Sequence, residues 1–246
     1  MEAEFKDAEI FKRMMDATGN LMSDVSIDFN EEGFAIKAMD PANIAMVLFE
    51  AKNSIFSSFN IEKPIKISVS LDDLNGILKL VKKDDKLKIS DSKNKLVLDI
   101  RGKTKQHFTI PLIDENYTAQ KIPQLKFTAE VTVLSSLVKD SVKAAALVDD
   151  SIYFTVDMPR LIISSKSEEK EFSQDLSIND NKEIFDMKSE STTRSKYSIE
   201  YLTKFLYSAD SEKPIKLSFS NNYPLKLDYE INSDAKMSFI LANRLE

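Results

Sequence analysis

The chain has 246 residues, of which 42% are apolar and 30% charged, with a net charge of −6 and an isoelectric point near 5.1. This length allows one large domain or two of about 120 residues, and the absence of cysteine excludes disulfides and thiolate metal sites. No apolar run reaches the roughly 20 residues of a membrane span and the acidic N-terminus does not resemble a signal peptide, so we expect a soluble intracellular protein.

Four stretches carry the period of an amphipathic helix, and short alternating stretches fill most of the remaining chain. In the first helical stretch, Ile10, Met14 and Ala17 fall on one face while charged side chains cover the other. The predicted helices cover residues 7–20, 71–83, 135–147 and 197–209. The predicted strands include residues 26–29, 34–38, 66–69, 86–89, 96–100, 108–112 and 216–219.

These predicted elements occur twice in the same order. Residues 26–29, after the first helix, correspond to residues 151–154 after the third, at an offset of 125. The second helix and the strand at 86–89 correspond to the fourth helix and residues 214–217, at an offset near 128. We therefore predict two copies of one α+β unit, over residues 1–112 and 126–246, joined by an aperiodic linker at 113–125.

The residues that catalysis most often needs are scarce. The four glycines are scattered, so neither a phosphate-binding loop nor a dinucleotide fingerprint is present. His107 is the only histidine and lies in an alternating, strand-like stretch, where we expect a surface or packing role. Carboxylates are abundant, and a carboxylate-dependent hydrolase on another two-domain fold is the competing reading. We expect no enzymatic activity, no cofactor and no metal site.

Basic residues are distributed unevenly in this acidic chain. The four predicted helices together carry a net charge of +1, and the rest of the chain carries −7. Within the second predicted helix, Lys79, Lys82 and Lys83 have the spacing of one helical face, as do Lys139 and Lys143 in the third. Such faces could form a basic stripe that contacts phosphates without reading bases, or they could be ordinary solvated surfaces. The residues alone leave both interpretations open.

Several short segments, taken in order, carry a resemblance to a known family. They are residues 38–46 (Ala-Met-Asp-Pro-Ala-Asn-Ile-Ala-Met), 71–79, 223–227 (Tyr-Pro-Leu-Lys-Leu) and 239–244 (Phe-Ile-Leu-Ala-Asn-Arg). Over essentially its whole length the sequence resembles the proliferating cell nuclear antigen type of sliding DNA clamp, in its archaeal form. Each motif is weak by itself, and their order, spacing and coverage together make the resemblance specific.

The resemblance implies an α+β DNA clamp fold. Its two similar domains would each have curved antiparallel sheets outside and two helices inside, and three subunits would form a ring with pseudo-six-fold symmetry around duplex DNA. Such a ring acts as a processivity factor in DNA replication and repair. Four residues match positions where the family is usually basic, namely Lys12, Arg13, Lys79 and Lys139. From helix geometry we add Lys82, Lys83, Lys143 and Lys204 to the expected DNA-facing set.

The resemblance also implies partner and subunit contacts. DNA polymerase, clamp loader, flap endonuclease and ligase would bind through short hydrophobic peptide motifs. The matching pocket positions are Met39, Asn43, Ile44, Met46, Gln120, Ile122, Pro123, Pro224, Ile240 and Ala242. Subunits would pair strands through Phe108, Ile110 and Leu112 on one edge and Phe172 and Leu176 on the other.

Some properties stay open at this point. Asn243 stands where the family usually has proline, which puts partner preference in doubt. A homotrimer, a heterotrimer and a damage-checkpoint ring all fit the sequence. For an archaeal chain the expected location is the cytoplasm, in association with the nucleoid.

Overall fold

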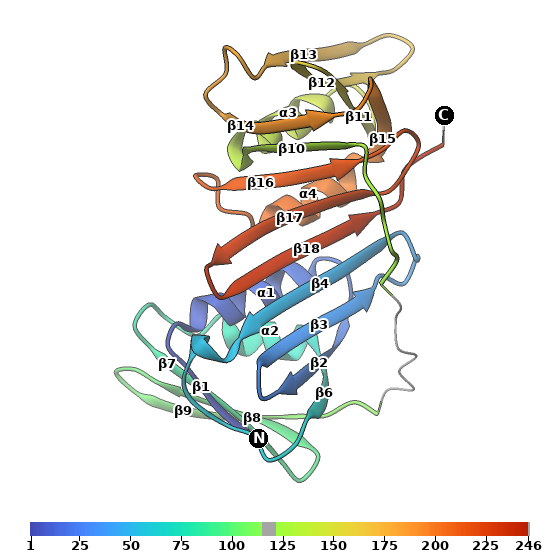
Figure 1. The fold of residues 1–246 in the computed structure, drawn as a ribbon. Coiled ribbons are helices and arrows are strands. Elements are labelled where there is room, and N and C mark those ends of the chain that lie inside the picture. Colours follow the sequence, from blue (N-terminus) through green and yellow to red (C-terminus); the bar gives the residue numbers. More distant parts are fainter. Residues whose placement is uncertain (115–121, 246) are drawn as a thin grey trace. The chain divides into compact units, whose positions relative to one another are not determined.

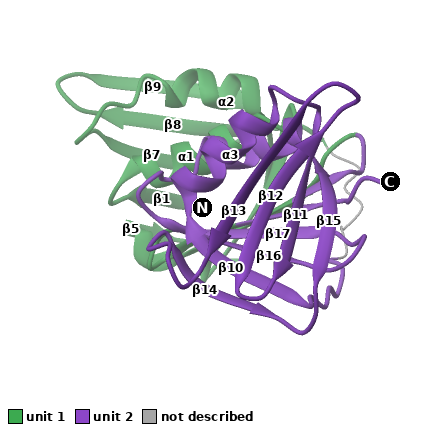
Figure 2. Ribbon diagram, turned by 90° about the horizontal axis from the view of Figure 1, so that it is seen from above, with its two compact units in different colours: residues 1–41, 47–121, 231–237 green, residues 42–46, 122–230, 238–246 purple. Residues whose placement is uncertain are grey.

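The computed structural model describes residues 1–114 and 122–245, so most of the predicted linker lies outside the described residues. The chain divides into two compact units (Figure 2). Unit 1 contains residues 1–41, 47–121 and 231–237, and unit 2 contains residues 42–46, 122–230 and 238–246. The short segments 42–46 and 231–237 therefore belong to the opposite unit from the residues that flank them.

The two halves of the chain are built from the same series of elements. The first half contains β1 (Glu2–Phe5), α1 (Ala8–Gly19), β2 (Asp24–Asn30), β3 (Gly33–Met39), β4 (Ala45–Lys52), the 3-10 helix η1 (Asn53–Ile55), β5 (Phe56–Asn60), β6 (Ile65–Ser70), α2 (Leu71–Leu78), β7 (Lys86–Ser92), β8 (Lys95–Arg101) and β9 (Lys105–Pro111). The second half contains β10 (Ala129–Leu134), α3 (Ser135–Ala145), β11 (Ser151–Asp157), β12 (Arg160–Lys166), β13 (Glu171–Ser177), β14 (Ile184–Ser189), β15 (Thr193–Ser198), α4 (Ile199–Tyr207), β16 (Pro214–Phe219), β17 (Leu225–Asn232) and β18 (Ala235–Leu241).

Strand order repeats as well. The order β5-β1-β7-β8-β9 in the first half has its counterpart in β14-β10-β16-β17-β18. The order β4-β3-β2-β6 has its counterpart in β13-β12-β11-β15. This confirms the internal repeat, and it makes β9 the counterpart of β18 and β13 the counterpart of β4.

In each unit two helices pack together against strands, as Figure 1 shows for α1 with α2 and for α3 with α4. The predicted apolar face of α1 is buried, with Ile10, Met14 and Ala17 at most 6% exposed. Phe5 and Phe11 meet there with ring centroids 4.8 Å apart. Each fully buried Ile, Met or Phe side chain stabilises the fold by about 1.5–3 kcal/mol.

Helix α2 is shorter than predicted and ends at Leu78, whereas the sequence predicted a helix to residue 83. It begins as expected, with the Ser70 hydroxyl accepting from the backbone of Asp73 and with acidic residues in the first turn. Beyond Lys79 the chain turns, and Asp84 has the left-handed φ of 72°. The Asp85 carboxylate accepts the Lys82 backbone N–H at 3.0 Å, which holds this turn before β7.

Candidate functional site

The basic residues expected to face DNA begin on α1, in unit 1. Lys12 lies 3.3 Å from the Glu9 carboxylate, one turn earlier, and its side chain is only 22% exposed. Arg13 is half-buried and also has an interaction partner. Asp16 lies close enough to Lys12 and Lys79 to feel both charges, yet burial dominates and raises the pKa of Asp16. The polar side of α1 therefore carries acids beside its cations.

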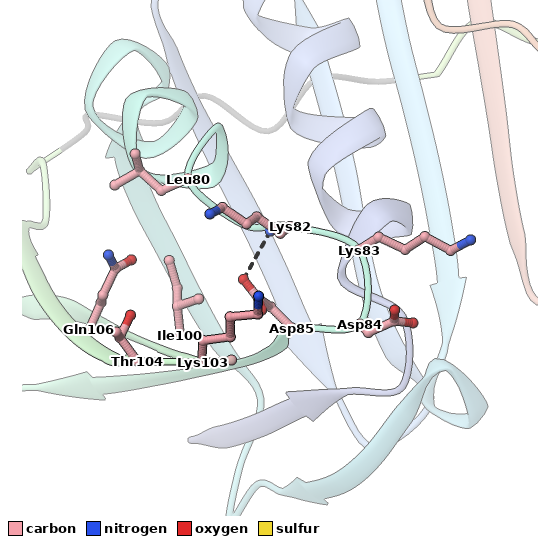
Figure 3. A pocket seen from close by; sticks show the side chains of 10 residues that line it. Leu80, Lys82, Lys83, Asp84, Asp85, Ile100, Lys103, Thr104 and Gln106 are labelled. Carbon is pink, nitrogen blue, oxygen red and sulfur yellow. Dashed lines mark hydrogen bonds between the residues drawn. The ribbon is translucent and has the colours of Figure 1, made fainter.

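The cations after α2 do not form the helical face that their spacing predicted. Lys79 is the C-terminal cap residue of the helix, and Lys82 and Lys83 lie in the following turn, all three exposed. Figure 3 shows the Lys82 and Lys83 side chains running in opposite directions from this turn. Lys82, Lys83 and Lys103 line a cavity of about 440 Å³ between the turn and the β8–β9 hairpin. The prediction of one shared face was wrong because the helix ends at Leu78.

Gly102 explains how closely the hairpin approaches that turn. A Cβ atom at Gly102 would lie 1.9 Å from an Asp85 carboxylate oxygen, so a larger residue would displace the Asp85 side chain, which accepts the Lys82 N–H. Glycine at this position thus lets the β8–β9 hairpin pack against the segment that carries the two lysines.

In unit 2 the expected cations are each engaged locally. The Lys139 ammonium donates to the Ala209 carbonyl at 2.5 Å, beyond the end of α4. Lys143 lies 3.2 Å from the Asp140 carboxylate and Lys204 lies 2.7 Å from the Glu200 carboxylate. Exposed ion pairs of this kind contribute about 0–1 kcal/mol, so a lysine can leave its acid for a phosphate at little cost.

The residues expected to bind partner peptides lie mostly in unit 2. Ile44 is an exposed apolar side chain (39%), and its carbonyl accepts the Ala242 N–H at 2.9 Å. Asn43 is exposed, with the left-handed φ of 58°. Met46 and Ile240 are 2% and 7% exposed, so their side chains belong mainly to the core and offer a partner little surface.

The other expected pocket positions differ in exposure. Pro224 is half-buried, and Ile122 is 44% exposed beside the exposed Pro123. Met39 is half-buried at the end of β3, in unit 1. Gln120 lies outside the described residues.

Two hydrogen bonds of this region were not predicted from the sequence. The Tyr197 hydroxyl donates to the Tyr223 carbonyl at 2.8 Å and so fixes the residue before Pro224. The Arg244 guanidinium donates to Asp150 Oδ1 at 2.6 Å, across 94 positions of sequence. No local pattern could reveal either contact, because both join residues far apart in the chain.

The strands expected at the subunit interface are edge strands. Among the described strands, β9 pairs only with β8 and β13 only with β12. Ile110 and Leu176 are 6% and 8% exposed and pack into their own units. Phe108, Leu112 and Phe172 are only partly covered.

His107 lies on the same edge strand β9. Its Nδ1 atom is 2.8 Å from Asp99, the residue opposite on β8, which fits the expected surface role. Within residues 1–114 and 122–245, no three histidine, aspartate or glutamate side chains gather as a metal site requires. None of the helices in that part of the chain is long and apolar enough to cross a membrane.

Comparison with known proteins matches the whole chain. The family model "Proliferating cell nuclear antigen, N-terminal domain" matches residues 1–116, and its C-terminal counterpart matches residues 121–244. The curated DNA polymerase sliding clamp of Pyrococcus furiosus is 31% identical over 246 residues, which is 100% of this chain and 98% of that protein.

Two solved structures agree with the fold in detail. The crystal structure of PCNA from Thermococcus kodakaraensis superposes with a TM-score of 0.94 at 27% identity, covering 99% of both chains. A structure of the C-terminal region of FEN-1 bound to A. fulgidus PCNA superposes with a TM-score of 0.89 at 26% identity, covering 100% of this chain and 98% of that one.

Proposed function

The chain belongs to the proliferating cell nuclear antigen family, and from this premise we propose that it is a DNA polymerase sliding clamp. It encircles duplex DNA as a ring and tethers replication and repair proteins to it. The observation that carries this proposal is the match of two consecutive clamp-domain models to the two halves of a chain that repeats one topology.

Two strand edges support a ring. Among the described strands, β9 is hydrogen-bonded to β8 alone and β13 to β12 alone. On this proposal β9 of one copy pairs with β13 of the next. Two different edges form a head-to-tail interface, which closes into a ring when the rotation allows. It also covers two open sheet edges.

The charges support weak, non-specific contact with DNA. The candidate cations on the helices are held by nearby acids or carbonyls, as in the Lys204–Glu200 and Lys139–Ala209 contacts. A phosphate can replace such exposed partners, yet each contact stays weak and screened by salt. Contacts to phosphates carry no sequence information. The ring would thus be retained on DNA mainly by its topology, which permits sliding.

We propose that Ile44, Pro224, Ile122 and Ala242 form the apolar surface that binds short peptide motifs. In support, Ile44, Ile122 and Ala242 are exposed and Pro224 is half-buried. On this proposal DNA polymerase, clamp loader, flap endonuclease and ligase bind there, and the protein itself is not an enzyme. The relatives reported above are archaeal, and for an archaeal chain the place of action is the nucleoid in the cytoplasm. A subunit of a heterotrimeric or checkpoint-type ring is the second form of the same function.

Native mass spectrometry of the protein expressed alone, followed by a synthesis assay, tests the proposal. A homotrimer has three times the chain mass of 27.9 kDa, about 84 kDa. Added with a cognate loader and polymerase to primed circular DNA, the trimer should lengthen the products, and linear DNA should release it by sliding from the ends. A monomer that assembles only with a second gene product would support the heterotrimer. Unchanged product lengths with an assembled ring would contradict the proposal.

A further inference from the structure

The segment after β18, residues 242–244, is fastened at both of its ends within unit 2. Building on the proposed partner-binding role, we propose that the Arg244–Asp150 ion pair positions this segment as one wall of the peptide pocket. Arg244 is thus a positioning residue, which acts on partner affinity without being an anchor site itself.

Several convergent hydrogen bonds hold the Arg244–Asp150 pair in place. Arg244 Nη1 donates to Asp150 Oδ1 at 2.6 Å and to the Ser151 hydroxyl oxygen at 2.9 Å. The Ser151 hydroxyl in turn donates to Asp150 Oδ1 at 2.8 Å. Hydrogen bonding from Arg244 lowers the pKa of Asp150, so the carboxylate is ionised throughout the neutral range. The backbone N–H of Arg244 also donates to the Lys196 carbonyl of β15, at 2.8 Å.

The opposite end of the segment lies at the proposed pocket. Ala242 donates its N–H to the carbonyl of Ile44, whose side chain is the exposed apolar residue of that surface. Only Asn243 separates Ala242 from Arg244, which the ion pair with Asp150 holds in place. Fixing Arg244 therefore restricts the backbone that borders Ile44, and a partner peptide meets an ordered wall. Ordering the backbone costs conformational entropy, so a wall that is already ordered favours binding.

The neighbouring positive charges make Asp150 essential for holding Arg244 in place. The Arg194 and Lys196 head groups lie 4.2 Å and 5.4 Å from the centroid of the Tyr153 ring. Lys196 is also close enough to Asp150 to lower the pKa of that carboxyl. Without Asp150, Arg244 would lose the acid to which it is hydrogen-bonded and would keep the Lys196 charge nearby. We therefore expect Asp150→Asn to release the segment as effectively as Arg244→Ala does.

Calorimetry with a net-neutral synthetic peptide, carrying a glutamine and apolar or aromatic anchors, measures the effect. Both side chains are partly exposed, so Arg244→Ala and Asp150→Asn should each weaken peptide binding by only about threefold to tenfold. Each single variant should lose nearly as much affinity as the double variant does. The double variant should be no weaker than the singles, because one interaction is removed in all three. Hydrogen exchange should accelerate at the Arg244 and Ala242 amides.

Three further variants make the result decisive. Lys188→Ala breaks another exposed ion pair of unit 2, with Asp186 on β14, and should change nothing. The exchange Arg244→Asp with Asp150→Arg should restore part of the affinity. Ile44→Arg tests the pocket itself and should abolish binding.

Unchanged affinity in Arg244→Ala, while Ile44→Arg abolishes binding, would overturn the positioning role of the Arg244–Asp150 pair and leave the proposed pocket intact. Unchanged affinity in both variants would overturn the positioning role and the proposed pocket together. Loss in Arg244→Ala alone would overturn the positioning role, because that role acts through the backbone beside Ile44, and would make Arg244 a direct contact of the peptide.

Discussion

The buried Tyr197 on β15 donates its hydroxyl proton to the carbonyl oxygen of Tyr223, 26 positions later, at 2.8 Å. The Ser195 hydroxyl donates to the same oxygen at 3.3 Å. Two neighbouring side chains of one strand thus hold the backbone immediately before Pro224. Burial raises the pKa of Tyr197 well above its usual value, so its hydroxyl keeps its proton and continues to donate at neutral and mildly alkaline pH.

Replacing Tyr197 with phenylalanine should therefore destabilise the protein by about 1 kcal/mol, the usual net contribution of a buried hydrogen bond. The Tyr223 carbonyl keeps Ser195 as a partner, which limits the loss. Denaturant unfolding measures the difference. Tyr153→Phe removes a hydroxyl from a half-buried tyrosine of the same unit and is the matched control. Equal stability of the Tyr197 variant and the wild type would show that the bond contributes nothing.

Asp16→Asn should raise stability at neutral pH. Burial raises the pKa of Asp16 above 3.8, which means that the folded state disfavours the ionised carboxyl. The resulting penalty is absent below pH 3.8, where the folded and unfolded states both bind the proton, and it develops as pH rises through the folded-state pKa. We expect a gain below about 1 kcal/mol at pH 7, because Lys12 and Lys79 offset part of the burial. Urea unfolding at pH 3.5 and pH 7 checks this, and a variant less stable than wild type at pH 7 would contradict it.

Phe172→Glu should prevent assembly. The side chain lies on the edge strand β13, and a subunit interface there would bury the introduced carboxylate without a partner, at a cost of several kcal/mol. Sedimentation should show monomers with unchanged circular dichroism. Phe185→Glu alters an exposed phenylalanine on β14, another edge strand of unit 2, and should still assemble. Wild-type assembly by Phe172→Glu would place the interface elsewhere.

Ile44→Arg should abolish peptide binding while the ring still forms. Loss of a central apolar anchor typically costs 2 kcal/mol or more, which is about 30-fold in affinity. Leu147→Arg changes an apolar side chain that is 76% exposed in the same unit, and serves as the control. Calorimetry with a polymerase-tail peptide makes the comparison. Wild-type affinity in the Ile44 variant would relocate the site.

The double variant Lys79→Glu and Lys83→Glu should assemble and bind peptide normally, yet shorten products on primed circular DNA. Association with DNA weakens with salt because each phosphate contact releases counterions, and the variant should show a smaller salt dependence. Lys63→Glu with Lys93→Glu makes the same charge change at two other exposed lysines of unit 1. Equal product lengths for both double variants and wild type, at every salt concentration, would mean that Lys79 and Lys83 are ordinary solvated lysines.

Much of the fold could be predicted from the sequence because its signals are local. The spacing of Ile10, Met14 and Ala17 already specifies which side of α1 is buried, since helical period determines which residues share a face. The offset between the two series of elements already indicated two copies of one unit. The absence of cysteine and the single histidine restricted the available chemistry. The edge strands containing Phe108 and Phe172 could be named by resemblance.

Tertiary structure alone decided the details of the candidate sites. The spacing of Lys79, Lys82 and Lys83 fits a helix, but Asp85 accepts a backbone N–H there and the chain turns instead. Met46 and Ile240 match pocket positions, yet their side chains are almost wholly buried. Arg244 and Asp150 meet across 94 positions, and no local period carries information about such a pair. A sequence pattern records which residues share a face of one element, whereas the partner of each side chain depends on how distant elements pack.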